Sequence, residues 1–413
     1  MRPSKLQLTW AFPILLVALQ GARPGPRTLA EFPDNCEEGE QASGALSLIC
    51  MPVEREWNGD LVIYAHGYVA FNEPIEIPDL ELPDGTFIPD LVNGLGYAFA
   101  TTSYSINGLA VLEGIEDARD LIHVFGEAHG EPNRVYLSGA SEGGLVAALA
   151  VEQSPDEFDG GLVSCGPIGD FRQQINYWGD FRVLFDYFFP GLIPGSPFDI
   201  PKEVIEDWDE LYAPAISEAV NSAPDATDQL LTVAQAPIDE EDPATKEETV
   251  LGLLWYNIFA TNDGTAKLGG QPFGNLLRIY RGSESDLRLN RKVERVGADQ
   301  AALDEIEAHY QTSGDLTSPV VSLHTIKDPI VPYWHVLGYG LKVHGSDSGD
   351  LYRHIPIPRY GHCEFKTAEV LVAFALLVFQ VTGEELTGVE QVLSDPEAWA
   401  EYQRLAREHG VMQ

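Results

Sequence analysis

The sequence has few basic residues and, beyond its N-terminus, lacks long apolar runs. Asp and Glu number 64 against 25 Lys and Arg, which gives a formal net charge of −39. Nucleic acids and anionic membranes bind proteins through basic surfaces, so this composition argues against both as partners. Past the N-terminus no apolar stretch reaches the roughly 20 residues of a spanning helix. We therefore expect no membrane span in the mature chain.

An acidic chain of this kind repels itself least where salt screens its charges. We therefore hypothesise that the protein tolerates concentrated salt. Hydrophobic residues make up 44% of the 413 positions, enough for a full core, so the chain is not of the disordered class.

Residues 1–22 resemble an export signal. Arg2 and Lys5 make the start basic, residues 11–19 are almost wholly apolar, and the small residues Gly21 and Ala22 follow. The apolar run is too short for a lasting membrane anchor. This pattern predicts a secreted or periplasmic protein.

Cysteines are few. Cys36 and Cys50 are close in sequence and, in an exported protein, are expected to form a disulfide. Cys165 and Cys363 are left either to pair or to stay as buried thiols, because four cysteines permit three pairings. No clustered His, Cys and Asp spacing of the zinc-binding kind is present, so we expect neither a metal nor an organic cofactor.

Short apolar segments alternate with helical patterns on both sides of a long middle region. Residues 111–129 predict a helix, because Ile115, Ala118 and Ile122 recur at spacings of three and four. Strands that alternate with helices predict a mostly parallel sheet with flanking helices. The segments expected as strands are residues 45–51, 61–65, 97–102, 135–137, 161–165, 319–324 and 354–357.

Residues 166–318 interrupt this alternation and are rich in aromatic residues and proline. Structureless loops of such length are uncommon in compact domains, so we expect a largely helical cap. Most of its aromatic side chains should form the core of the cap, and a few should face a cleft. Residues 239–248 are polar and acidic and are expected to be a solvated loop.

One motif carries the clearest chemical signal. Residues 139–143 read Gly-Ala-Ser-Glu-Gly, with a β-rich run before them and an Ala- and Leu-rich helical run after them. Small residues around Ser141 allow a sharp strand-to-helix turn that exposes the hydroxyl above the sheet edge. The alternative is an ordinary turn between a strand and a helix. The context favours Ser141 as a nucleophile.

A serine nucleophile needs a base within hydrogen-bond reach and a carboxylate that orients this base. Asp328 follows a predicted strand, and His362 follows Gly361 in the loop after the last strand. The order Ser, Asp, His agrees with a triad, although Asp328 before Pro329 also suits a simple turn. We expect these three side chains to meet at one edge of the sheet.

The oxyanion that such a reaction forms needs two preorganised N–H donors. The backbone N–H of Glu142, directly after the nucleophile, is one candidate. The loop at residues 66–68 follows the strand at residues 61–65, and the Tyr68 N–H is the second candidate. The alternative is that His66 and Gly67 only terminate the strand.

With these features in this order, the chain resembles the α/β-hydrolases. The resemblance covers residues 45–381 and rests on the His66-Gly67 turn, the serine motif, the Asp328-Pro329 segment and the Gly361-His362 loop. More narrowly, it is similar to secreted bacterial esterases and prolyl-oligopeptidase-like hydrolases. It implies an α/β-hydrolase core in two parts, residues 36–165 and 319–413, with a helical cap at residues 166–318 between the sixth and seventh strands.

The His362-Cys363 pair also resembles tannases and feruloyl esterases, in which a cysteine beside the histidine bridges to one just before the nucleophile. Here Ala140 stands before Ser141, so that bridge cannot form. Cys165 ends the neighbouring predicted strand and is a candidate to replace it.

Together these features predict an exported serine esterase of small-molecule or polymeric carboxylic esters, with no cofactor. A serine peptidase on the same triad is the main alternative, and a non-catalytic binding module is a weaker one, because the complete triad argues against it.

Overall fold

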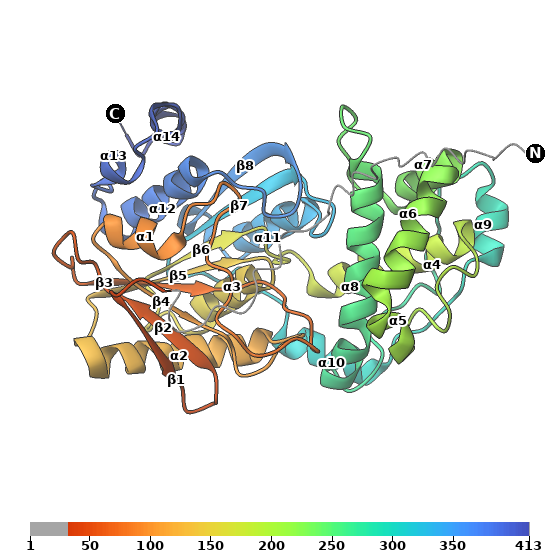
Figure 1. The fold of residues 1–413 in the computed structure, drawn as a ribbon, viewed down its shortest axis with the longest axis horizontal. Coiled ribbons are helices and arrows are strands. Elements are labelled where there is room, and N and C mark those ends of the chain that lie inside the picture. The colour runs from red at the N-terminus through yellow and green to blue at the C-terminus, as the bar shows by residue number, and fades with distance from the viewer. Residues whose placement is uncertain (1–31, 413) are drawn as a thin grey trace, which may run out of the picture.

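The computed structural model describes residues 32–412, and one eight-stranded sheet lies at the centre of the fold (Figure 1). The strand order is β1-β2-β4-β3-β5-β6-β7-β8. The strands β3 to β8 run parallel to one another, whereas β2 is antiparallel to both β1 and β4. The expected export signal, residues 1–22, lies outside the described residues. The strands are β1 (Cys36–Glu40), β2 (Leu46–Cys50), β3 (Asp60–Ala65), β4 (Ala98–Thr102), β5 (Arg134–Ala140), β6 (Gly160–Ser164), β7 (Val320–Lys327) and β8 (Tyr352–Tyr360).

Helices cover both faces of the sheet, and the strands are apolar on both sides for this reason. In β3, Leu61 and Ile63 belong to one buried layer and Val62 to the other, as the two-residue period of a strand requires. The helices α2 (Val111–His129), α3 (Glu142–Gln153) and α11 (Trp334–Gly345) contribute to the first layer. The second layer contains α1 (Ile88–Gly94), α12 (Thr367–Thr382), α13 (Val389–Val392) and α14 (Pro396–Glu408).

The chain between β6 and β7 forms a mostly helical unit beside the carboxyl ends of the central strands (Figure 1). Most of its apolar side chains pack on one another in a separate core. The prediction of a mostly parallel sheet with flanking helices and a helical cap between the sixth and seventh strands is confirmed. The helices are α4 (Phe171–Phe188), α5 (Lys202–Glu206), the π-helical turn η1 (Trp208–Tyr212), α6 (Ala213–Ser222), α7 (Pro224–Ala234), α8 (Thr245–Lys267), α9 (Asp286–Lys292) and α10 (Gln300–His309).

The acidic segment at residues 239–248 differs from its prediction as a loop, because its last four residues start α8. The Thr245 hydroxyl donates to the backbone carbonyls of Asp239 and Asp242 and fastens the turn that precedes the helix. Glu247 and Glu248 lie in the first turn, where negative charge is favourable next to the free N–H groups.

Two further elements were not expected from the sequence. The strand β1 is an exposed edge with an acidic sequence and no apolar alternation, so it carries no strand pattern. The helix α1 spans only seven residues inside a proline-rich stretch. The C-terminal tail holds the two helices α13 and α14, because Asp395 caps a new helix with Pro396 in its first turn.

Candidate active site

Ser141 occupies the sharp turn between β5 and α3. Its backbone has φ 56° and ψ −120°, a conformation that L-residues rarely adopt. The turn leaves no room for larger neighbours. A Cβ atom on Gly139 would lie 1.9 Å from the Gly143 carbonyl oxygen, and one on Gly143 would lie 2.0 Å from the Ala65 carbonyl oxygen. The glycines of the motif are therefore required by the close approach of β3, β5 and α3.

The structure brings the three predicted side chains into a continuous hydrogen-bonded chain. His362 Nε2 lies 2.8 Å from Ser141 Oγ, and His362 Nδ1 lies 2.7 Å from Asp328 Oδ2. Asp328 directly follows β7, and His362 follows β8 after one glycine. With the Nδ1 proton donated to Asp328, His362 Nε2 is free to accept the Ser141 hydroxyl proton.

The Asp328 carboxylate is completely buried, and both of its oxygens have hydrogen-bond partners. Oδ1 accepts hydrogen bonds from the backbone N–H groups of Ile330 and Val331, at 2.9 and 3.0 Å, and Oδ2 faces His362. Burial by itself would raise the pKa of Asp328. The positive charge of His362 and hydrogen bonds from His324 and His362 more than offset this and lower the pKa to about 2.

The loop after β3 lies directly against Ser141. A Cβ atom on Gly67 would lie 3.2 Å from Ser141 Cβ, and the next residue, Tyr68, lines the same pocket as Ser141 and Glu142. Within residues 32–412, the N–H groups of Tyr68 and Glu142 donate to no backbone acceptor. Both candidate oxyanion donors are therefore available to a ligand.

The Glu142 side chain has an unusual environment for a carboxyl group. It is buried beside Ser141, and Oε1 accepts a hydrogen bond of 2.7 Å from the Ala110 N–H. Desolvation raises the pKa of Glu142 to about 8, although the Ala110 hydrogen bond and Lys267 act in the opposite direction. The side chain is consequently neutral over most of the physiological range.

The cap helix α8 is joined to the core beside Ser141. Asp263 accepts a hydrogen bond from the Leu109 N–H at 2.7 Å, and Lys267 donates to the Asn107 carbonyl at 2.6 Å. The Tyr68 hydroxyl donates to the Phe259 carbonyl at 3.0 Å. These bonds hold one side of the cap against the loop before α2 and the loop after β3.

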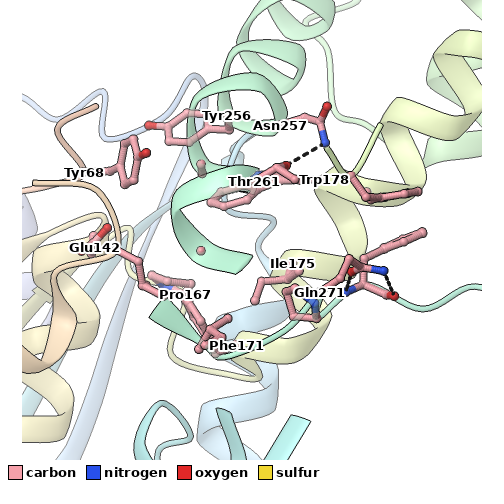
Figure 2. A pocket seen from close by; sticks show the side chains of 18 of the residues that line it. Tyr68, Glu142, Pro167, Phe171, Ile175, Trp178, Tyr256, Asn257, Thr261 and Gln271 are labelled. Carbon is pink, nitrogen blue, oxygen red and sulfur yellow. Dashed lines mark hydrogen bonds between the residues drawn. The ribbon is translucent and has the colours of Figure 1, made fainter. Parts of the chain in front are cut away.

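An apolar pocket lies between the cap and Ser141 (Figure 2). Trp178 from α4 stacks on Tyr256 from α8 with ring centroids 4.9 Å apart. As expected, a few cap aromatics face the cleft while the others form the cap core. The aromatic and aliphatic lining residues are Tyr68, Leu109, Phe171, Ile175, Trp178, Phe198, Tyr256, Leu268, Phe273 and Val331.

Both cysteine pairs form disulfides. Cys36 pairs with Cys50 across β1 and β2, and Cys165 pairs with Cys363 across 198 residues, with Cα atoms 5.5 Å apart. The second bond ties the end of β6 to the residue after His362. Among residues 32–412, the side chains close enough to share a metal are Cys165, His362 and Cys363, but a disulfide holds both sulfurs.

The order of the elements around the site identifies the fold. The turn with Ser141 follows β5, Asp328 follows β7 and His362 follows β8, on a sheet in which β2 is the one described strand that runs opposite to the others. The chain has the α/β-hydrolase fold. Ser141, Asp328 and His362 therefore lie at the strand ends where this fold can carry a nucleophile, an acid and a base.

Comparison with family models finds no match for this chain. One similarity in sequence is local. The chain is 34% identical over 107 residues to an o-phthalyl amidase from Xanthobacter agilis, a match that spans 24% of this chain and 23% of the amidase.

Solved structures overlay on most of this chain at low identity. A feruloyl esterase B from Aspergillus oryzae is 13% identical over 85% of this chain and 88% of its own, with a TM-score of 0.42. Est1E from Butyrivibrio proteoclasticus is 14% identical over 84% and 97%, with a TM-score of 0.38. An acylaminoacyl peptidase from Pyrococcus horikoshii is 11% identical over 87% of this chain but only 44% of its own, with a TM-score of 0.44.

Proposed function

We propose that this protein is a serine hydrolase that cleaves carboxylic esters. The observation that carries the proposal is the hydrogen-bonded chain from buried Asp328 through His362 to Ser141, which ends at an apolar pocket. The combination supplies a nucleophile, a base, an orienting carboxylate and a place for the acyl group.

In the proposed reaction, Ser141 Oγ attacks the ester carbonyl carbon while His362 Nε2 takes the hydroxyl proton. The carbonyl oxygen becomes an oxyanion and accepts hydrogen bonds from the Tyr68 and Glu142 N–H groups. When this intermediate collapses, the alcohol leaves with the proton from His362, and Ser141 carries the acyl group. Water then repeats the cycle with His362 as the base and releases the acid.

The pocket favours substrates with an aromatic or other apolar group. Its walls are dominated by ring and aliphatic side chains, and Trp178 and Tyr256 offer ring faces for stacking. Among the described residues that line it, none is Lys or Arg. An anionic group on the substrate therefore has no cationic side chain to pair with there.

Amide hydrolysis is the second candidate, because the local sequence match is to a protein named as an o-phthalyl amidase. The same groups serve an amide if His362 protonates the leaving nitrogen.

A serine peptidase that binds the terminal amino or carboxylate group of its substrate would also need a charged side chain to hold that group. Glu142 is the ionisable carboxyl in the pocket lining, and its Oε1 is engaged by the Ala110 N–H.

Rates with p-nitrophenyl butyrate, p-nitrophenyl benzoate, an o-phthalyl anilide and amino-acyl p-nitroanilides test these candidates. We expect turnover of the esters, with the benzoate preferred, and loss of both turnover and fluorophosphonate labelling in Ser141→Ala. Cleavage of the anilides alone would replace the esterase proposal with an amidase or a peptidase. Absence of labelling in the wild-type protein would favour a binding module.

We also propose that the protein acts outside the cytoplasm. The two disulfides and the signal pattern at residues 1–22 support export. In the described part of the chain, no helix has the length and apolarity to cross a membrane. Fractionation of cells that express the full chain should place the mature protein in the medium or the periplasm, shortened at its N-terminus.

A further inference from the structure

A completely buried cation lies inside the cap, behind the wall of the apolar pocket. Arg182 belongs to α4, and its Nε donates to both carboxylate oxygens of Asp186, at 3.1 and 3.2 Å. Its Nη1 donates to Asn257 Oδ1 of α8 at 3.1 Å, and its Nη2 has no hydrogen-bond partner within residues 32–412. Of these contacts, the one with Asn257 leads towards the pocket, because Asn257 is one of the lining residues.

The guanidinium group sets the orientation of the Asn257 amide. A guanidinium can only donate hydrogen bonds, so the amide oxygen must face it and the amide NH₂ group must point away. Nδ2 donates to the Thr261 hydroxyl at 3.2 Å, which Figure 2 shows as a dashed line, and to the Pro197 carbonyl at 3.3 Å. The three partners of the amide are therefore consistent with this one orientation.

Thr261 keeps one hydrogen-bond donor that the protein does not use. A threonine hydroxyl in a helix can donate to the carbonyl four residues earlier, as Thr382 does to Val378. In the described part of the chain, the Thr261 hydroxyl has Asn257 Nδ2 as its one partner, and in that bond it accepts. Its own hydrogen is therefore available to a ligand, and Thr261 lines the same pocket as Ser141.

Two other polar side chains of the lining are already engaged. Gln271 Nε2 donates to the Phe273 carbonyl at 3.0 Å, and Gln271 Oε1 accepts from the Phe273 N–H. The Tyr68 hydroxyl donates to the Phe259 carbonyl at 3.0 Å. Thr261 differs from both because it still has a donor to offer.

We propose that Arg182, Asn257 and Thr261 form a hydrogen-bond relay, and that the Thr261 hydroxyl binds a neutral oxygen acceptor on the acyl group of the substrate. Hydrogen bonds in a chain strengthen one another, and a charged donor at its start increases the effect. Arg182 and Asn257 act through Thr261 and are positioning residues. Asp186 balances the guanidinium charge behind the pocket wall, so the site suits a neutral oxygen.

This inference rests on the proposed function and narrows its substrate class. The preferred esters are aryl esters that carry an acceptor such as a ketone oxygen away from the bond that is cleaved. Aromatic faces of the pocket hold the ring, and the Thr261 hydroxyl fixes its position within the pocket.

The test uses matched esters with and without an acceptor. Kinetics are measured with p-nitrophenyl 3- and 4-acetylbenzoate and with the corresponding isopropylbenzoates, which have a similar shape but no ketone oxygen. Thr261→Val keeps the shape of the side chain and removes its hydroxyl. We expect the acetyl-to-isopropyl ratio of kcat/KM to fall about tenfold in this variant for at least one ring position, through KM, because one hydrogen bond to the substrate is lost. Comparing the same esters in two proteins cancels their different intrinsic reactivities.

Thr265→Val is the matched control. Thr265 lies about one turn further along α8, its hydroxyl is buried without a hydrogen-bond partner among the described residues, and it does not line the pocket. The control should keep the wild-type ratio, and Thr261→Ser, which retains a hydroxyl, should keep most of the preference. A wild-type ratio in Thr261→Val at both ring positions, or an equal fall in the control, would overturn the proposal.

Infrared spectroscopy tests the relay without turnover. The ¹³C-labelled ketone of 3- or 4-acetylbenzamide, whichever binds more tightly to Ser141→Ala, should absorb at a lower frequency than in an apolar solvent. Adding Thr261→Val should abolish this shift, and adding Arg182→Met/Asp186→Asn should reduce it. An unshifted band, or a shift that either change leaves intact, would reject the relay. If the shift is present but the wild-type protein hydrolyses none of the esters, the proposed function fails and the binding site stands.

Discussion

At the scale of single residues, the two oxygens of Asp328 have separate tasks. Oδ1 accepts two backbone N–H groups and Oδ2 faces the His362 ring. This asymmetry determines how an amide would sit in the same place. In Asp328→Asn, the amide oxygen must remain on the backbone side, and the NH₂ group must face His362 Nδ1.

We therefore expect Asp328→Asn to keep the fold and lose activity. The NH₂ group would force Nδ1 to act as an acceptor, so the ring proton would move to Nε2, which could then no longer take the Ser141 proton. The expected fall in kcat is about 10⁴-fold. Steady-state kinetics and thermal unfolding of the variant check this, and retention of more than a tenth of the wild-type kcat would contradict the role of Asp328.

Glu142 should set an alkaline limit to activity. Its pKa of about 8 means that higher pH places a negative charge beside the oxyanion, which that charge destabilises. We expect kcat/KM to decline above about pH 8, and the decline to disappear in Glu142→Gln, which stays neutral and still accepts from the Ala110 N–H.

Stability gives an independent check of the same shift. Between pH 4.5, the ordinary pKa of a glutamate, and about pH 8, the folded protein holds the Glu142 proton whereas the unfolded chain releases it. This group therefore makes stability fall as pH rises through that window. Denaturation of Glu142→Gln should show a smaller decrease over the same range. A wild-type pH dependence in the variant would disprove the shift.

The sequence predicted where Ser141, Asp328 and His362 would meet, because motif, chain order and strand ends all place them at one edge. The structure puts them within hydrogen-bond distance, and their catalytic role stays a prediction until it is tested. The cap residues that line the pocket, Trp178 and Tyr256 among them, could not be singled out in the same way, because the path of the cap follows no regular sequence pattern.

At the scale of elements, the disulfide between Cys165 and Cys363 connects β6 to the loop that carries His362. The other disulfide, Cys36–Cys50, lies across the β1–β2 edge, whereas the candidate site is formed at the ends of β5, β7 and β8. The effects of removing the two disulfides can therefore be compared, because one disulfide restrains the candidate base His362 and the other restrains a remote edge of the sheet.

Replacing both members of each pair by alanine should separate these roles. Each double variant should lose roughly 2–4 kcal/mol of unfolding free energy. Only Cys165→Ala/Cys363→Ala should also lose kcat/KM, by roughly ten- to hundredfold, because small displacements of a catalytic group are costly. Equal kcat/KM in the two double variants would show that the disulfide does not position His362.

The sequence predicted most of the central elements and fewer of the peripheral ones. A strand that is covered on both faces needs a continuous apolar run, so β3 to β7 could be recognised in the sequence by such runs. The strand β1 and the short α1 gain their stability from neighbours in space, and their own sequences carry little signal. The start of α8 was mistaken for a loop because its residues are polar and acidic, a composition that also suits a solvated loop.

At the scale of the whole molecule, the excess of negative charge works against compactness. A formal charge of −39 on one chain creates repulsion that folding concentrates into a smaller volume. We expect the melting temperature to rise with NaCl up to about 1 M, where the screening length is about 3 Å. Scanning calorimetry across this range checks the effect, with sucrose as an uncharged control, and a flat or falling response would refute salt tolerance.

The cap leaves the sheet after β6 and returns at β7, and these two strands are hydrogen-bonded neighbours. The two ends of the inserted segment therefore lie side by side, at two strands that pair with each other without any contribution from the segment. Variation in that segment can change the shape of the pocket, while the geometry of the candidate triad, set by β5, β7 and β8, stays the same. Changes in substrate preference and changes in the catalysed reaction can thus arise from different segments of the chain.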